Sequence, residues 1–286
     1  MVPPPPILPG LSEIAARYDA LICDVWGVLH NSITAKAPAV DALRRFRAAH
    51  GPVVLLTNAP RPVEDVLVQF ERIGVPEDCY DAIMTSGAAA RLDLERRAQA
   101  RRLPMFHLGP ERDIGVYRGL NVDCVAPEAA EIALCTGLYD HDRETPEDYR
   151  DLLARLHARG LTLLCANPDI QVHVGDKLVY CAGAIAQAYA AIGGEVVYYG
   201  KPHRPIYEAT LHLAEDAAGR AIARPLAIGD GIATDIAGAN GAGIDALFIA
   251  DGVHGEEIGA LTPENLGRLF AKSGVAAVGA MPALMW

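Results

Sequence analysis

The chain has 286 residues, of which 51% are hydrophobic and 21% charged, and its formal net charge at pH 7 is −11. This composition is typical of a globular protein, and the length exceeds one ordinary domain of roughly 100–200 residues. The acidic balance argues against a general electrostatic interaction with nucleic acid or an anionic membrane, because such binding requires clustered Lys and Arg.

Short apolar runs alternate with helical patterns along most of the chain. Strands are expected at residues 20–25, 52–58, 82–86, 105–109, 131–137, 161–167, 195–200, 225–230 and 245–250. Helices are expected at residues 38–49, 62–73, 87–101, 146–159, 181–192, 203–217, 233–242 and 262–272. Continuous apolar strands separated by helices predict an α/β fold with parallel sheets covered on both faces.

The first residues and the cysteines indicate the compartment. The opening segment MVPPPPILPG lacks the basic and long apolar stretches of a secretory signal and is expected to form an extended arm. No run approaches the ~20 apolar residues of a membrane span. The 6 cysteines lie far apart without a CxxC pair, which favours buried reduced thiols over disulfides or a zinc site. We therefore expect a cytoplasmic protein with no membrane or nucleic-acid partner.

Four of the expected strands end in polar residues that suggest chemistry. The first ends at Asp24, the second at Thr57 and Asn58, a later strand continues into Lys201, and another continues into Asp230 with Asp235 just beyond. Ligands of open parallel sheets bind at the carboxyl ends of the strands. The long stretch between the second and third of these ends has its own strands and helices, which predicts an inserted domain and not a loop.

These four strand ends, in this order, resemble the motifs of the haloacid dehalogenase (HAD) superfamily, whose members are mostly Mg²⁺-dependent phosphatases. The matching stretches are DVWGVL, LLTNAPRP, GKPHRPIY and GDGIATDIAGANGAG. The insertion carries ANPD before GKP and is similar to the class IIA branch, which includes sugar-phosphate, nitrophenyl-phosphate and pyridoxal-phosphate phosphatases. The resemblance implies a Rossmann-like core formed by residues 1–86 and 197–286, and a smaller α/β cap domain at residues 87–196.

The resemblance also implies a reaction and its catalytic residues. A phosphate monoester is anionic and resists attack by a carboxylate unless its charge is neutralised. Asp24 would attack phosphorus to form an aspartyl-phosphate that water then hydrolyses, while Lys201 and Thr57 would bind the phosphoryl group. Mg²⁺, which prefers oxygen ligands, would be held by Asp24, Asp230, Asp235 and the backbone carbonyl of Trp26.

Further residues are expected to contact the substrate, a small phosphorylated metabolite such as a sugar phosphate. Asn58 and the backbone at Gly27 would complete the phosphate cradle. Asn167 and Asp169, in the ANPD stretch, would orient the substrate or brace the hinge, and we favour bracing. Caps of this kind often take part in dimer contacts in the superfamily, so the resemblance also suggests a homodimer.

Position 26 departs from the superfamily pattern, because Trp26 replaces the second aspartate of the nucleophile motif. That aspartate is the general acid–base, and losing such a group typically costs ~10²–10⁴ in rate. One hypothesis is a phosphatase with a low-pKa leaving group or with another proton source, such as His30 or His203. A second is a weakly active or inactive phosphometabolite-binding protein. A third, a dehalogenase, is disfavoured because dehalogenases need no metal and the pair Asp230 and Asp235 is retained.

Overall fold

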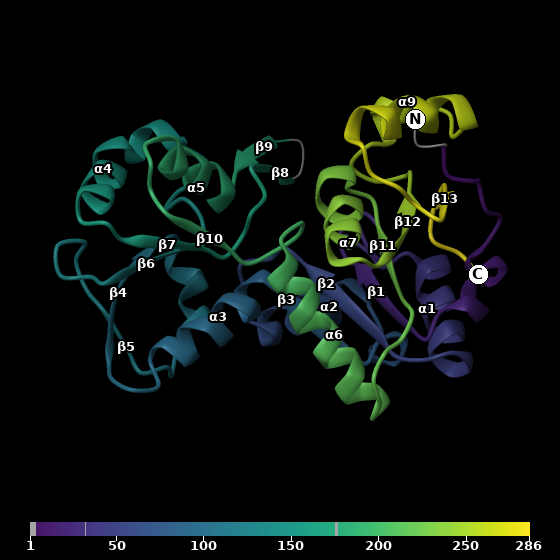
Figure 1. Cartoon of the computed structure of the whole chain (residues 1–286), viewed down its shortest axis with the longest axis horizontal. Coiled ribbons are helices and arrows are strands. Elements are labelled where there is room, and N and C mark those ends of the chain that lie inside the picture. The colour runs from purple at the N-terminus through teal and green to yellow at the C-terminus, as the bar shows by residue number, and fades with distance from the viewer. Residues whose placement is uncertain (1–3, 32, 175–176) are drawn as a thin grey trace. The chain divides into compact units, whose positions relative to one another are not determined.

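The computed structural model describes residues 4–31, 33–174 and 177–286. The expected extended arm at the N-terminus therefore lies partly outside the described residues. The chain divides into two compact units (Figure 1), which we name here. The core unit comprises the chain up to Thr57, Glu64–Met84 and Lys201–Trp286. The inserted unit comprises Asn58–Val63 and Thr85–Gly200.

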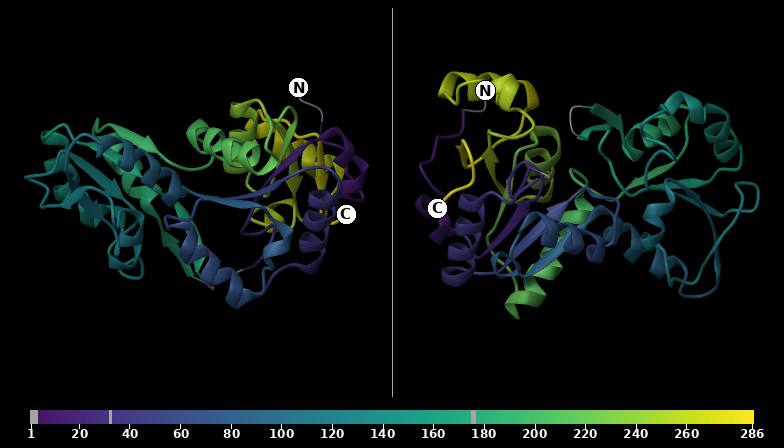
Figure 2. Two further views of the ribbon diagram at one scale, coloured as in Figure 1. Left: turned by 90° about the horizontal axis from the view of Figure 1, so that it is seen from below. Right: turned by 180° about the vertical axis from the view of Figure 1, so that it is seen from behind.

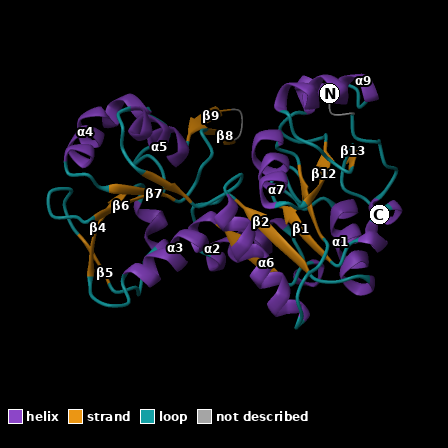
Figure 3. Ribbon diagram, viewed as in Figure 1, coloured by secondary structure: helices purple, strands orange, loops and turns teal. Residues whose placement is uncertain are grey.

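The core unit is built on one sheet, whose strands are orange in Figure 3. The described strands lie in the order β13-β12-β11-β1-β2-β3. They are β1 (Ala20–Asp24), β2 (Val53–Thr57), β3 (Ala82–Thr85), β11 (Pro225–Gly229), β12 (Asp245–Ile249) and β13 (Gly279–Met281). The ladders from β13 to β2 are parallel. The sheet joins strands from the start of the chain, purple to blue in Figure 2, with green to yellow strands from its end.

Helices cover this sheet and bury its apolar strands. They are α1 (Ala37–Ala49), α2 (Val63–Ile73), α6 (Arg204–Ala218), α7 (Ala237–Ala242), α8 (Gly255–Ile258) and α9 (Pro263–Ser273). All residues of β1 are buried, as a strand covered on both faces requires. Ala214 of α6 packs against Ala20 and Val54, and these small side chains allow the helix to lie close to the sheet.

The inserted unit has its own parallel sheet and a separate hairpin. The sheet order is β10-β7-β6-β4-β5, and β8 pairs antiparallel with β9. The bounds are β4 (Leu103–Leu108), β5 (Val122–Cys124), β6 (Ile132–Cys135), β7 (Thr162–Cys165), β8 (Gln171–Val174), β9 (Lys177–Tyr180) and β10 (Val196–Tyr198), with α3 (Ser86–Arg97), α4 (Arg150–Ala158) and α5 (Ala182–Ala191). Leu153 and Leu156 of α4 and Ile185 and Tyr189 of α5 share one hydrophobic core with β7.

The predicted α/β class with a Rossmann-like parallel-sheet core is confirmed, whereas the antiparallel hairpin β8–β9 was not expected. The short strands β5 and β13 were also not expected, because three residues carry too little periodicity to be read from sequence. The helix expected at 233–242 is a π-helical turn, Ile232–Ile236, followed by α7. No helix in the described ranges is long and apolar enough to cross a membrane.

Candidate active site

The candidate site lies at the carboxyl end of the core-unit sheet, where the register brings three of the predicted strand ends together. Asp24, the last residue of β1, pairs with Leu56, so Thr57 follows directly on the neighbouring strand. On the other side Cys23 pairs with Ile228, so Asp230 comes two residues later. Parallel pairing therefore places residues that are far apart in sequence at one edge of the sheet.

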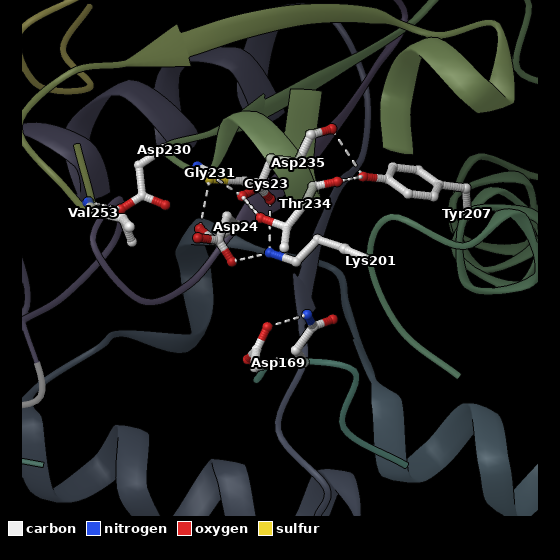
Figure 4. A network of polar contacts seen from close by, with 11 residues as sticks. Cys23, Asp24, Asp169, Lys201, Tyr207, Asp230, Gly231, Thr234, Asp235 and Val253 are labelled. Atoms are coloured by element: carbon white, nitrogen blue, oxygen red, sulfur yellow. Dashed lines mark hydrogen bonds and ion pairs between the residues drawn. The ribbon is translucent and has the colours of Figure 1, made fainter. Parts of the chain in front are cut away.

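Lys201 joins two of the predicted acids (Figure 4). Its Nζ donates to Oδ1 of Asp24 and, at 2.7 Å, to Oδ1 of Asp235. All three side chains are buried in the core unit. Asp24 and Lys201 are thus held in a direct ion pair although they lie 177 positions apart in the chain.

Asp235 is fixed by the π-helical turn that carries it. Its Oδ2 accepts from the backbone N–H of Gly231 at 3.0 Å and from Oγ1 of Thr234 at 3.2 Å. Its backbone carbonyl accepts from the hydroxyl of Tyr207, on α6, at 3.0 Å (Figure 4). These bonds leave Oδ1 directed to Lys201, so Asp235 orients the lysine in this structure.

Asp230 follows β11 and is held between the loops that follow β1 and β12, the two strands beside β11. Its Oδ2 accepts from the backbone N–H of Val253 at 2.9 Å. A Cβ atom at Gly27 would lie 2.0 Å from this oxygen, and one at Gly252 would lie 1.9 Å from it. Gly27 also has φ +79°, a left-handed conformation that favours glycine. Any side chain at these two positions would therefore displace the carboxylate.

Trp26 lies in the turn after Asp24 and is 39% exposed. The backbone N–H of Gly27 donates to the carbonyl of His30 at 2.9 Å, so it is already engaged within the turn. Gly27 thus shapes the turn and admits Asp230, and its expected contact with phosphate stays a prediction. Nζ of Lys36 donates to the carbonyl of Gly27 at 2.5 Å and contacts that of Asp251 at 3.4 Å, tying two site loops together.

The pKa shifts in this cluster arise first from burial and then from the neighbouring charges. Burial, and then the charge of Asp235, raise the pKa of Asp24 well above its usual range, although Lys201 opposes this effect. Burial and Asp235 also raise the pKa of Asp230 to about 6. Burial alone would lower the pKa of Lys201, but the carboxylates of Asp235 and Asp24 outweigh it and raise the pKa. The lysine therefore stays charged but does not neutralise three acids.

The donor set fits a divalent cation. Carboxylate oxygens of Asp24, Asp230 and Asp235 lie within 4.8 Å of one another, and all three residues are buried. Two like charges at that separation repel by on the order of 3 kcal/mol at an effective dielectric constant of about 20. Mg²⁺ prefers such oxygen ligands, and a cation here would relieve this repulsion. The acids therefore match the metal that the resemblance implied.

The two histidines considered as proton sources are both in the core unit. His30 is buried, and its ring packs edge-on against Phe70 with centroids 6.0 Å apart. Burial lowers the pKa of His30 to about 4 and also lowers that of His203, the residue before α6. Both imidazoles are therefore neutral near pH 7, which makes them poor general acids.

The remaining predicted residues cluster in the inserted unit. Nδ2 of Asn58 donates to Oδ1 of Asp169 at 2.8 Å, and the backbone N–H of Asp169 donates to Oδ1 of Asn167 at 3.0 Å. These bonds tie the segment Asn58–Val63 to the loop after β7. This arrangement favours the bracing interpretation of Asn167 and Asp169 over direct substrate binding.

A cavity of about 150 Å³ lies within the inserted unit. Its lining combines apolar side chains with the polar residues Arg61, Arg112, Asp113, Thr136, His141 and Asn167. Nη2 of Arg112 lies 3.2 Å from Nδ1 of His141. The lining therefore holds groups of both charges.

Four contributors to the core-unit site were not found from the sequence: Lys36, Tyr207, Gly252 and the backbone of Val253. Gly252 and Val253 follow β12, which pairs with β11, so the stretch DGVHG after a predicted strand was a usable signal. Tyr207 and Lys36 act through backbone carbonyls, and such contacts leave no residue pattern in the sequence.

The chain matches known hydrolases along most of its length. A haloacid dehalogenase-like hydrolase family model matches residues 21–122, and a HAD-hydrolase-like model matches residues 198–270. A crystal structure of a haloacid dehalogenase-like hydrolase from Brucella suis 1330 is 43% identical, with a TM-score of 0.84 over 97% of this chain and 100% of that chain. The ribonucleotide monophosphatase NagD of Escherichia coli K12 is 26% identical over 82% of this chain and 88% of its own.

A further solved structure shares the fold at lower identity. It is the glycerol phosphate phosphatase Rv1692 from Mycobacterium tuberculosis in complex with magnesium, which is 21% identical with a TM-score of 0.65. That match covers 84% of this chain and 70% of that chain. The resemblance inferred from the strand-end motifs, including the class IIA branch, is confirmed by these matches. The chain belongs to the haloacid dehalogenase-like hydrolase family.

Proposed function

We propose that this hydrolase is a Mg²⁺-dependent phosphatase that acts on small phosphorylated metabolites, with Asp24 as its nucleophile. One observation carries the proposal: Asp24 is buried in ion-pair contact with Lys201 and within 4.8 Å of two further carboxylates. A carboxylate alone would repel a phosphate, so this arrangement has a use only when positive charge is supplied next to it. The phosphatase names of several relatives support the same reaction class.

Each residue then has a defined part in the reaction. Asp24 attacks phosphorus, the bond to the leaving oxygen breaks, and water later cleaves the aspartyl-phosphate to release phosphate. Lys201 orients Asp24 and attracts the phosphoryl oxygens, while Thr57 donates to them from the end of β2. Asp24, Asp230, Asp235 and the carbonyl of Trp26 would hold Mg²⁺, which when bound neutralises charge on the phosphoryl group.

The finer assignments concern the inserted unit, the assembly and the location of the protein. We propose that residues 87–196 form a cap that selects the substrate, with Asn167 and Asp169 bracing its connection to Asn58. A homodimer stays a prediction of the resemblance. A cytoplasmic location is supported by the cysteines, all of which have free thiols and most of which are buried.

A second candidate function is a phosphometabolite-binding protein with little turnover. Trp26 favours it, because an indole cannot serve as the general acid–base. The retained nucleophile, lysine and metal acids argue against it, since a binding protein gains nothing from a buried carboxylate that faces a phosphate.

The test is turnover of nitrophenyl phosphate and a panel of metabolite esters with Mg²⁺ by the wild type, Asp24→Asn and Asp169→Ala. We expect Mg²⁺-dependent phosphate release that Asp24→Asn abolishes and Asp169→Ala retains in part. Release that persists in Asp24→Asn, or binding of phosphate esters with no release by the wild type, would contradict the proposal.

A further inference from the structure

The side chains that the structure shows bonded to Asp24 and Asp235 offer no evident acid for the leaving group. The titratable ones include Cys23, Lys201 and Tyr207. The thiol of Cys23 donates to the carbonyl of Asp24 at 3.2 Å, and the hydroxyl of Tyr207 donates to the carbonyl of Asp235. Both protons are therefore already used within the protein.

The charged members of the cluster are no better as acids. Lys201 bridges Asp24 and Asp235, so giving up its proton would break its ion pairs with two buried carboxylates. Asp230 and Asp235 are ionised when they bind a cation. Trp26, two residues after the nucleophile, has no proton to give near neutral pH.

An alkyl phosphate needs such a proton more than other phosphate compounds do. An alcohol is about as acidic as water, whose pKa is about 16, whereas a phenol has a pKa of about 10 and a carboxylic acid about 4. The less basic oxygens can leave as anions, because they stabilise the electron pair of the broken bond themselves.

Apolar surface adjoins the same residues. Trp26 is 39% exposed and Val253 is 61% exposed. Trp26 precedes Gly27, which packs on Asp230, and Val253 donates its backbone N–H to Asp230. Two apolar residues exposed on the turns that contact this metal-binding carboxylate suit a planar apolar leaving group better than a sugar.

We propose that the preferred substrates carry the phosphoryl group on an oxygen of low basicity, foremost an aryl oxygen, which departs without a proton from the protein. This inference rests on the proposed phosphatase function and narrows its substrate class. In the first step an Asp24 oxygen forms a bond to phosphorus, and the leaving oxygen keeps the electron pair and takes its proton from solvent afterwards. In the second step water attacks phosphorus, Asp24 recovers its electron pair, and the water proton passes to solvent.

Hydrolysis of the aspartyl-phosphate, the second step, should also be affected by the missing acid–base group. Water attacks the aspartyl-phosphate without a positioned base, so this step is slow relative to the first when the leaving group is good. Aryl substrates should therefore give a burst of phenol close to one equivalent per Asp24, followed by slower steady turnover. An intact general acid–base would speed this second step and so reduce the burst.

The test is a leaving-group series of nitrophenyl, phenyl, acetyl and glycerol phosphates, assayed with Mg²⁺ on the wild type, Trp26→Asp and Trp26→Asn. Asp and Asn have nearly the same size, so the pair isolates the carboxyl group from the loss of the indole. We expect wild-type kcat/KM on the aryl and acyl esters to exceed that on glycerol phosphate by ~10²–10⁴. Trp26→Asp should raise glycerol phosphate turnover by a similar factor, while Trp26→Asn should not.

The substrates and variants of this test distinguish the aryl preference, a preference for acyl phosphates and the absence of phosphatase activity. Acetyl phosphate turned over faster than nitrophenyl phosphate would overturn the aryl preference and assign the site to acyl phosphates. Wild-type turnover of glycerol phosphate within tenfold of the aryl esters would overturn the inference and leave the phosphatase proposal intact. Absence of turnover and of phosphoryl-Asp24 with every ester would overturn both. If Trp26→Asp does not fold, the leaving-group series and the burst measured on the wild type still test the inference.

Discussion

Asp230→Asn should stabilise the metal-free protein above pH 6, because the buried carboxylate is unfavourable without a cation. Burial and the charge of Asp235 raise the pKa of Asp230 from 3.8 to about 6. Each pKa unit corresponds to 1.36 kcal/mol, so the difference of about two units corresponds to roughly 3 kcal/mol. An asparagine is neutral, keeps the carboxylate's size, and still offers an oxygen to the N–H of Val253.

The sign of the pH dependence follows from the two pKa values. Below about pH 3.8 Asp230 is protonated in both the folded and the unfolded chain, so it does not lower the free energy of unfolding. Between pH 3.8 and 6 the folded protein holds the proton more tightly, so wild-type stability falls as pH rises. Above about pH 6 the full cost is present, and the advantage of Asp230→Asn reaches its maximum.

The assay is urea unfolding in EDTA at several pH values from 4 to 7.5, followed by tryptophan fluorescence. Trp26 and Trp286 both belong to the core unit, so this signal reports on the unit that contains the site. We expect Asp230→Asn to gain about 3 kcal/mol at pH 7.5 and little at pH 4. Glu71→Gln, an exposed acid on α2, is the matched control and should change stability by less than ~0.5 kcal/mol. A variant that is no more stable than the wild type at pH 7.5, or a gain that does not shrink toward pH 4, would refute the reasoning.

Other variants test the same cluster. Lys201→Met removes the ammonium bonded to Asp24 and Asp235, and should cost ~3–5 kcal/mol of unfolding free energy in EDTA; unfolding curves that match the wild type would contradict this. Gly252→Ala places a Cβ 1.9 Å from Oδ2 of Asp230 and should weaken Mg²⁺ binding at least tenfold by calorimetry. Gly241→Ala, where a Cβ meets nothing within 4 Å, should leave the affinity unchanged, and equal losses in both variants would argue against a local effect.

The strand ends were predictable because buried parallel strands are continuous apolar runs and their last residues stand out. Asp24, Lys201, Asp230 and Asp235 were placed together in this way. These residues meet because of the order of the strands in the sheet. The resemblance implied that order, whereas hydrophobic periodicity alone did not predict it. The domain boundaries at residues 86 and 196 stay predictions of the pattern.

The rest could not be read from the sequence for physical reasons. Tyr207 lies 28 positions from its partner Asp235 and acts on a backbone carbonyl, so its part depends on how α6 packs. The π-helical turn around Asp235 looks like an ordinary helix start, because the extra residue changes hydrogen bonding and not composition. The bond between Asn58 and Asp169 could not be foreseen either. Bracing was the favoured role of Asp169, but the sequence did not show its partner, and Asn58 was expected in the phosphate cradle.

The central claim is that Asp24 is a phosphoryl acceptor held ready by Lys201 and the metal acids. The most direct test is mass spectrometry of acid-quenched protein after brief incubation with nitrophenyl phosphate and Mg²⁺, with peptides mapped across Asp24. We predict one phosphoryl group on Asp24 in the wild type, accumulating during the burst, and none in Asp24→Asn or without Mg²⁺. Rapid phosphate release with no adduct on Asp24, or an adduct that survives in Asp24→Asn, would contradict the account.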